Sequence, residues 1–149
     1  QGHYAVAGYF QSVDNAENRR WVDGFRREFG HDRVTGDPQE AQWCLVQMWK
    51  AAVEKAGSFD TEAVRQVLRE GMEIAGPGGT IRLDPKTQHC SRYFRVGRIR
   101  PDRQFDIVHA SAAPIDPDPY PQVAFPGWKC DWTAGGIVRG QEVSIDGDL

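Results

Sequence analysis

The chain has 149 residues, is 40% hydrophobic, contains five Trp and seven Phe, and has a net charge of −3. This composition is typical of a globular protein rather than a disordered one, and the length is sufficient for one hydrophobic core. Because acidic and basic residues are interspersed, no field forms that would hold a polyanion, and we expect no nucleic-acid partner. No apolar run approaches the roughly 20 residues that span a bilayer, and Gln1–Tyr4 has no signal-peptide pattern. The chain is therefore expected to carry no targeting signal of its own.

The first predicted element is a strand. His3–Phe10 consists mostly of small, β-branched and aromatic residues, which is typical of a strand buried on both faces inside a parallel sheet. Asp14 and Glu17 then have capping-box spacing, and apolar residues recur at helical intervals as far as Gly30. These features predict an amphipathic helix after the strand.

Two further helices are expected. Asp37–Glu40 combines an acid suited to the N-cap, a Pro at the first helical position and a Glu three residues after the cap. A single apolar stripe then runs to Gly57 and comprises Ala41, Cys44, Leu45, Met48, Trp49, Ala52, Val53 and Ala56. Asp60 caps a shorter helix that ends at Gly71.

The second half of the chain has β character. Gly76–Gly79 predicts a bend, and Thr80–Leu83 a short strand. Tyr93–Arg100 and Gln104–His109 are β-type runs separated by Pro101–Arg103, which predicts a hairpin. Beyond it, prolines prevent regular ladders, so an extended tail is expected; they are Pro114, Pro117, Pro119, Pro121 and Pro126. Residues 134–149 are Gly-rich and acidic at the end, and they predict a loose terminus.

The cysteines and histidines indicate no reactive site. Cys44, Cys90 and Cys130 have neither a CxxC spacing nor an even number, so no disulfide framework or zinc site is expected. Cys44 is on an apolar helix face and is expected to pack in the core. A bridge between Cys90 and Cys130 stays open, because their Cα separation is not readable from sequence. With no nucleophile elbow and no converging ligands, we predict no catalytic residue, no metal site and no cofactor.

Two short segments are candidates for ligand binding. Tyr9, Phe10, Gln11 and Ser12 follow the first strand at its C-terminal end, where α/β sheets place their ligand crevices. Two aromatic rings followed by two hydrogen-bonding side chains suit a small amide, although Tyr9 and Phe10 equally suit a core.

The second candidate is the helix start at Pro38, Gln39 and Glu40, where unpaired N–H groups and a partial positive charge can meet a polar ligand. The alternative is that Asp37 and Glu40 only cap their own helix.

A family resemblance covers the chain from about Tyr4 to about Trp132. It is carried by the segments YFQSVDNAENRRWVDGFRREFG, DPQEAQWCLVQMWKAAVEKAGSFDTEAVRQVL and PGGTIRLDPKTQHCSRYFRVGRIRPDRQFDIVHASAAPIDPDPYP. These segments resemble the C-terminal end of the amide- and urea-binding solute receptors of ABC importers, which are more than twice as long. Such receptors usually have Gly where Arg103 stands. Because a non-Gly residue with positive φ costs on the order of 1 kcal/mol, we expect a different turn type here.

The resemblance implies an α/β fold that is part of a two-lobed, type I periplasmic binding protein. It implies a parallel sheet flanked by helices, a C-terminal β-hairpin and an extended tail. Crossovers between the lobes would fall at about Gly8–Val13 and Pro77–Leu83. Residues 1–133 would then be receptor, with about 8–76 in the first lobe and about 84–133 in the second, and residues 134–149 a loose tail. The helix start at Pro38, Gln39 and Glu40 would border the cleft between the lobes.

The function implied is binding rather than bond-making. As the substrate-binding component of an ABC transporter, the protein would capture urea, a short amide or a related small nitrogen or amino-acid-like solute by lobe closure. Its partners would be a small polar solute, an ABC transporter permease, and the remaining N-terminal portion of the receptor or a second copy of the chain, in the periplasm. Two alternatives are a cytoplasmic amide-sensing regulatory protein of the same fold and a self-paired small α/β protein without a transport role.

Overall fold

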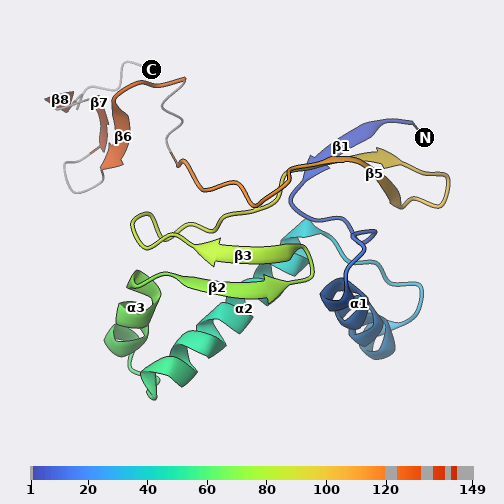
Figure 1. The fold of residues 1–149 in the computed structure, drawn as a ribbon, viewed down its shortest axis with the longest axis horizontal. Helices are drawn as coiled ribbons and strands as arrows, with labels where there is room; N and C mark the ends of the chain where they lie inside the picture. The colour runs from blue at the N-terminus through green and yellow to red at the C-terminus, as the bar shows by residue number, and fades with distance from the viewer. Residues whose placement is uncertain (1, 120–123, 132–135, 140–141, 144–149) are drawn as a thin grey trace. The chain divides into compact units, whose positions relative to one another are not determined.

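The computed structural model describes residues 2–119, 124–131, 136–139 and 142–143, and the chain forms two compact units, Gln1–Pro117 and Asp118–Leu149. The α/β class predicted from the sequence is confirmed (Figure 1). The first unit contains β1 (Tyr4–Ala7), α1 (Ala16–Phe29), α2 (Asp37–Ala56), α3 (Thr61–Arg69), β2 (Met72–Gly76), β3 (Gly79–Leu83), β4 (Arg95–Ile99) and β5 (Phe105–Ala110). The second unit contains β6 (Trp128–Asp131), β7 (Gly136–Arg139) and β8 (Glu142–Val143).

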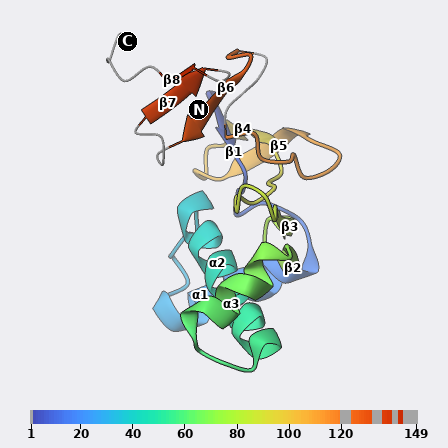
Figure 2. The same ribbon diagram turned by 90° about the vertical axis from the view of Figure 1, so that its left-hand side faces the viewer.

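The strands of the first unit form two separate antiparallel sheets, with strand orders β1-β4-β5 and β2-β3. Figure 2 shows the three helices and the β2–β3 hairpin together on one side of the β1-β4-β5 sheet. The hairpin predicted at Pro101–Arg103 is confirmed by the pairing of β4 with β5. The bend at Gly76–Gly79 is the turn of a second hairpin, because Met72–Gly76 is a strand that the sequence reading missed.

The interior parallel strand predicted at His3–Phe10 is wrong for the described part of the chain. β1 pairs only with β4, in the antiparallel sense, and the side chains of Tyr4 and Val6 are each 64% exposed. A parallel neighbour requires a crossover connection, and no described strand runs beside β1 in that sense. The apolar residues of β1 therefore correctly indicate a strand. They do not indicate its neighbours, and the edge of β1 opposite β4 is unpaired among the described residues.

The described residues of the second unit include short strands. β6, β7 and β8 form an antiparallel sheet in which Cys130 faces Ile137 and Val138 faces Val143. Ile137, Val138 and Val143 are β-branched and favour strands despite the glycines around them. The boundary between the two compact units follows Pro117.

The helix starts use caps other than those predicted, except in α3, where the predicted Asp60 accepts hydrogen bonds from the N–H groups of Glu62 and Ala63. The cap of α1 is Asn15, and not Asp14; its side chain accepts a hydrogen bond of 2.7 Å from the Asn18 N–H. The cap of α2 is Gly36, whose N–H donates 2.7 Å to the side chain of Gln39. Glu40 therefore has no capping role.

The hydrophobic core lies where α2 packs between α3 and the β2–β3 hairpin (Figure 1). Cys44 is buried there with Met48, Ile81 and Leu83, which confirms its predicted place in the core. Burial raises the pKa of the Cys44 thiol, so the thiol remains protonated. Cys90 is also a free thiol, while the side chain of Cys130 lies outside the described side chains.

A buried carboxylate lies at the N-terminal end of α2. Glu40 is fully buried and accepts hydrogen bonds of 3.0 Å from the Gly78 N–H and 2.6 Å from the Arg92 guanidinium. The approach requires a glycine, because a Cβ at Gly78 would lie 2.9 Å from a carboxylate oxygen of Glu40. A buried charge is stable only with such partners. Glu40 thus ties α2 to the β2–β3 turn and to the segment before β4.

A buried arginine continues this network. Arg95 donates to the carbonyl oxygen of Gly8 and, at 2.7 Å, to that of Gly78. Its guanidinium lies 4.7 Å from the centre of the Tyr93 ring. Asn15 donates 3.0 Å to the Pro77 carbonyl. The two segments that the resemblance assigns to crossovers are therefore cross-linked to each other through β4 and the start of α1.

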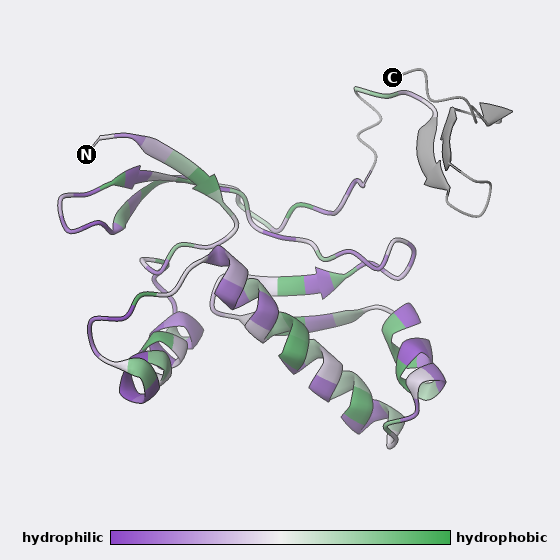
Figure 3. Ribbon diagram, turned by 180° about the vertical axis from the view of Figure 1, so that it is seen from behind, coloured by the Kyte–Doolittle hydropathy of each residue, from purple (hydrophilic) through white to green (hydrophobic). Residues whose placement is uncertain are grey.

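The outer side of α2 remains apolar and exposed. Leu45 is 49% and Trp49 50% exposed, so the apolar stripe predicted from the sequence is only partly buried. Figure 3 shows hydrophobic bands on the side of α2 that faces away from the β2–β3 hairpin. A helix that is apolar on several sides is normally buried on several sides. The described residues alone do not cover it.

We expect Glu40→Ala to lower the free energy of unfolding by about 3 kcal/mol, because it leaves Arg92 and the Gly78 N–H without their acceptor. Glu54→Ala is the matched control, since it breaks an exposed helical ion pair with Lys50 and should cost less than about 0.5 kcal/mol. Urea unfolding of both variants gives the comparison. Equal, small losses would contradict the structural role of Glu40.

We also expect the isolated 149-residue chain to bind a hydrophobic dye or to self-associate, because of the exposed face of α2. Dye fluorescence and light scattering measure this, and Trp49→Gln should reduce either signal without lowering the melting temperature. A monomer that unfolds cooperatively and binds no dye would contradict the expectation.

Candidate functional site

A pocket of about 230 Å³ lies between three parts of the first unit. Its walls are the segment after β1, the loop that leads into α2, and the end of the β4–β5 hairpin. The lining residues include Tyr9, Phe10, Gln11, Thr35, Asp37, Arg103, Gln104 and Phe105. The structure therefore brings the first predicted binding segment next to the start of α2.

The segment after β1 is fixed by the buried side chain of Asn18. The Asn18 amide donates 2.8 Å to the carbonyl of Gln11 and 2.6 Å to that of Val13, while its oxygen accepts 2.7 Å from the Tyr9 hydroxyl. Every polar atom of this side chain has a partner, which makes the segment rigid.

Tyr9 and Gln11 join this segment to the loop before α2. The Tyr9 hydroxyl lies 3.0 Å from the Thr35 hydroxyl, and the side-chain amide oxygen of Gln11 accepts a hydrogen bond of 2.8 Å from the Thr35 N–H. The side-chain amide nitrogen of Gln11, Nε2, has no protein partner among the described residues, so it is a donor available to a ligand.

Burial raises the pKa of Tyr9 to about 12, since water no longer solvates the phenolate. Tyr9 is therefore a neutral hydroxyl at physiological pH.

The apolar wall consists of Phe10 and Phe105, whose ring centres are 4.5 Å apart. They meet over Gly97, where a Cβ would come within 2.9 Å of both rings. Glycine at this position of β4 is therefore required for the aromatic pair to reach the pocket.

Arg103 is at the end of the hairpin with φ of +66°, so the expectation of a different turn type is wrong. The backbone is held there by hydrogen bonds from the Arg103 N–H to the Arg100 carbonyl, 3.1 Å, and from the Gln104 N–H to Asp102, 3.0 Å. A non-Gly residue in this region costs on the order of 1 kcal/mol. The chain thus accepts strain at a residue that lines the pocket.

The other predicted binding residues do not line this pocket. Ser12 has a buried hydroxyl without a hydrogen-bond partner among the described residues. Pro38 and Gln39 are exposed on the first turn of α2, and Glu40 is buried with both carboxylate oxygens bound by protein groups. Sequence reasoning missed Thr35, Arg103, Gln104 and Phe105. The one available signal was Arg103 at a turn position that favours glycine.

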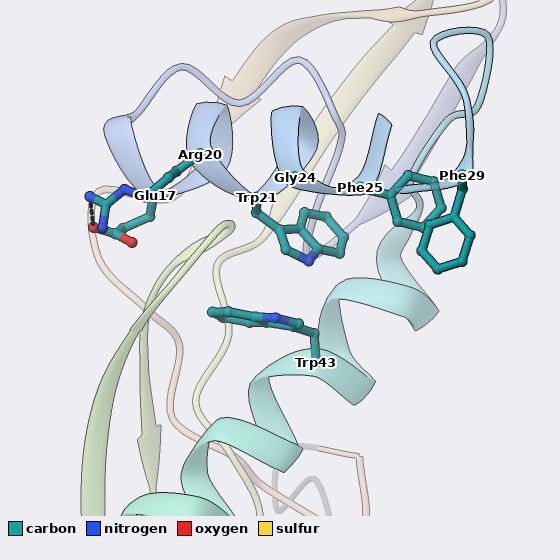
Figure 4. Close-up of a pocket in the computed structure, with 7 residues that line it drawn as sticks. All are labelled: Glu17, Arg20, Trp21, Gly24, Phe25, Phe29 and Trp43. Atoms are coloured by element: carbon teal, nitrogen blue, oxygen red, sulfur yellow. Dashed lines mark hydrogen bonds and ion pairs between the residues drawn. The ribbon is translucent and has the colours of Figure 1, made fainter. Parts of the chain in front are cut away.

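A larger pocket, of about 570 Å³, lies between α1 and α2. Figure 4 shows Trp21 and Trp43 facing each other across it, with Phe25 and Phe29 at one end. The polar groups drawn, Glu17 and Arg20, form an ion pair of 2.9 Å with each other. This surface offers aromatic contacts but few polar groups that would fix a ligand's orientation.

In the described ranges, no group of three or more His, Cys, Asp or Glu side chains has an arrangement suited to a metal ion. No helix in the same ranges has the length and apolarity needed to cross a bilayer.

Comparison with known proteins assigns the family. Residues 1–125 match the sequence family described as the periplasmic binding protein domain. The chain belongs to this family. Over 118 residues it is 34% identical to a Geobacillus stearothermophilus protein named limonene hydroxylase, covering 79% of this chain and 21% of that protein. It is 25% identical over 97 residues to Leu/Ile/Val-binding protein homolog 6 of Brucella abortus, covering 65% of this chain and 24% of that protein.

Two solved structures have the same fold. An ABC-transporter solute-binding protein of Rhodopseudomonas palustris, in complex with 3,4-dihydroxybenzoic acid, superimposes with a TM-score of 0.69 at 21% identity, over 78% of this chain and 32% of that one. A leucine-binding protein of Thermotoga maritima gives 0.62 at 18% identity, over 74% and 31%. The periplasmic binding protein type I fold predicted from the sequence is thereby confirmed. The chain spans about a fifth to a third of the length of these relatives.

We expect Tyr9→Phe to show that the Tyr9 hydroxyl must be neutral for folding. The pKa rises from 10 to about 12 on folding, so the stabilising effect is complete below pH 10 and is lost between pH 10 and 12. Wild type should be more stable than the variant by about 1 kcal/mol at pH 8, because of the two hydrogen bonds. Ionisation removes about 2 kcal/mol from wild type alone by pH 12, which reverses the order. Urea unfolding at both pH values measures this. A constant difference would contradict it.

Proposed function

We propose that the chain is part of the substrate-binding component of an ABC importer and that it acts by capturing a small polar solute. The observation that supports this most is the pocket shared by the segment after β1, the start of α2 and the β4–β5 hairpin. These parts belong to different predicted lobes, so a solute bound among them would favour a closed arrangement. The activity is then solute binding with closure of the lobes, without a catalysed reaction.

The solute proposed is urea, a short amide, or a related small nitrogen or amino-acid-like compound. The Gln11 amide supplies a hydrogen-bond donor, and Phe10 and Phe105 supply a flat apolar wall. A few oriented polar groups beside an aromatic wall are typical of sites for compact ligands. The relatives named for binding leucine and Leu/Ile/Val, and the one solved in complex with 3,4-dihydroxybenzoic acid, support a small organic solute.

The site residues remain a proposal. Tyr9, Phe10 and Gln11 line the pocket directly. Ser12, Pro38 and Gln39 would reach the solute only after a change in the cleft, such as closure. Glu40 would act by positioning the start of α2 rather than by touching the solute, because its carboxylate is already bound by Arg92 and Gly78.

The proposed partners are a permease in the membrane and the remaining N-terminal portion of the receptor, or a second copy of the chain. The exposed face of α2 and the aromatic pocket between α1 and α2 support a covering polypeptide. We place the protein in the periplasm. The free thiols of Cys44 and Cys90 favour the second candidate, a cytoplasmic amide-sensing protein of the same fold.

We propose no enzymatic activity. The relative named limonene hydroxylase aligns largely within the matched binding-protein range, because only residues 126–149 lie outside that range. The part of this chain that aligns with that relative is therefore mostly the part that matches the periplasmic binding protein domain.

We expect the full natural polypeptide that contains this chain to bind one of urea, acetamide, leucine or benzoate, with a decrease in radius of gyration. Gln11→Ala should weaken that binding about fivefold, which corresponds to one hydrogen bond of about 1 kcal/mol. Gln66→Ala, on the exposed side of α3, is the matched control and should change nothing. Calorimetric titration and small-angle scattering provide the measurements. Absence of any binding would overturn the proposed function.

A further inference from the structure

Arg103 is the feature of the pocket that its fold does not explain. The residue takes a backbone conformation that glycine would adopt without strain, and it caps no helix and pairs with no strand residue. Its side chain lines the pocket together with Phe10 and Phe105. A side chain other than glycine at a strained position beside a pocket indicates a functional role for that side chain.

The acidic groups around Arg103 are already paired. Asp102 binds Arg100 at 2.6 Å, and Asp106 lies within 3.5 Å of the same guanidinium. Across the pocket, Asp37 is 3.0 Å from Arg92. Arg103 itself has no ion pair among the described residues. Arg92 is shared between Asp37 and Glu40, so the lining also holds a carboxylate that is only partly neutralised. Arg103 is exposed, and it is a lining cation that no described carboxylate binds.

The neighbouring surface selects the rest of the ligand. The Phe10 and Phe105 rings form an apolar wall, and Gln11 offers its amide nitrogen. A guanidinium binds a carboxylate through two parallel, charge-assisted hydrogen bonds, whereas a neutral urea or amide offers a single uncharged acceptor oxygen. The set of groups fits a carboxylate attached to a compact apolar body.

We propose that Arg103 is the specificity-determining residue of this pocket and that it binds the carboxylate of the solute. The solute is then an apolar amino acid or an aromatic carboxylate, and not urea or a neutral amide. This inference depends on the proposed solute-binding function and assigns its solute to one chemical class, carboxylates with a compact apolar body. The strain at Arg103 is the consequence of placing a cation where the fold alone favours glycine.

The test uses two pairs of probes that differ only in whether they carry a carboxylate or its neutral amide: benzoate with benzamide, and leucine with leucinamide. In the full natural polypeptide, the carboxylate of one pair should bind at least tenfold more tightly than its amide. The pair that shows this identifies the apolar body as aromatic or aliphatic.

Arg103→Gly separates the effect of the side chain on affinity from the effect of the backbone conformation on stability. Because glycine suits a φ of +66°, the variant should keep or raise the melting temperature while the carboxylate loses at least tenfold in affinity. Arg103→Lys retains the charge and should recover part of the affinity. Calorimetric titration with thermal unfolding of each variant measures both effects.

The outcomes are distinct. Equal affinity for carboxylate and amide, or unchanged carboxylate affinity in Arg103→Gly, overturns the role of Arg103 and leaves the proposed function intact. Binding of urea or acetamide alone also overturns it. Failure to bind any probe overturns the role of Arg103 together with the proposed function.

Discussion

The buried carboxylate of Glu40 is the interaction on which the rest of the first unit depends. A charge removed from water must find donors within the protein, and Glu40 finds them on the β2–β3 turn at Gly78 and on the segment before β4 at Arg92. Three stretches that are distant in sequence are thereby held at one point. Arg95 connects the same turn to the end of β1 through the carbonyls of Gly78 and Gly8.

This arrangement leaves one side of the pocket, the segment after β1, rigid. The other side, the end of the β4–β5 hairpin, is less constrained. Asn18 fixes the segment after β1, while Arg103 and Gln104 approach from a hairpin end held only by local hydrogen bonds. In a protein that works by closing on a solute, such a division lets the hinge remain constant while the walls move. The outer side of α2 and the aromatic pocket beside α1 are apolar surface that the described residues leave uncovered. The chain spans about a third of the length of its structural relatives.

Much of this fold is predictable from local pattern, because helices and hairpins depend on nearby residues. The three helices, the β4–β5 hairpin, the core place of Cys44 and the grouping of Tyr9, Phe10 and Gln11 follow from spacing and turn chemistry. Side chains that act over long sequence separations do not. Glu40 has the spacing of a capping residue, and only the position of Gly78 and Arg92 turns it into the core. The pairing of β1 was mispredicted for a similar reason. An apolar sequence indicates that a strand is suited to burial, but it does not indicate which strand pairs with it.

Amide hydrogen exchange at Gly78 tests the central claim most directly. If the Glu40 carboxylate holds the turn as described, the Gly78 N–H opens only with the whole unit. Its exchange free energy should then equal that of the slowest amides in the middle of α2. Exchange at Gly78 as fast as at Gln104, in the exposed hairpin end, would contradict the account, because the turn would open independently of the core.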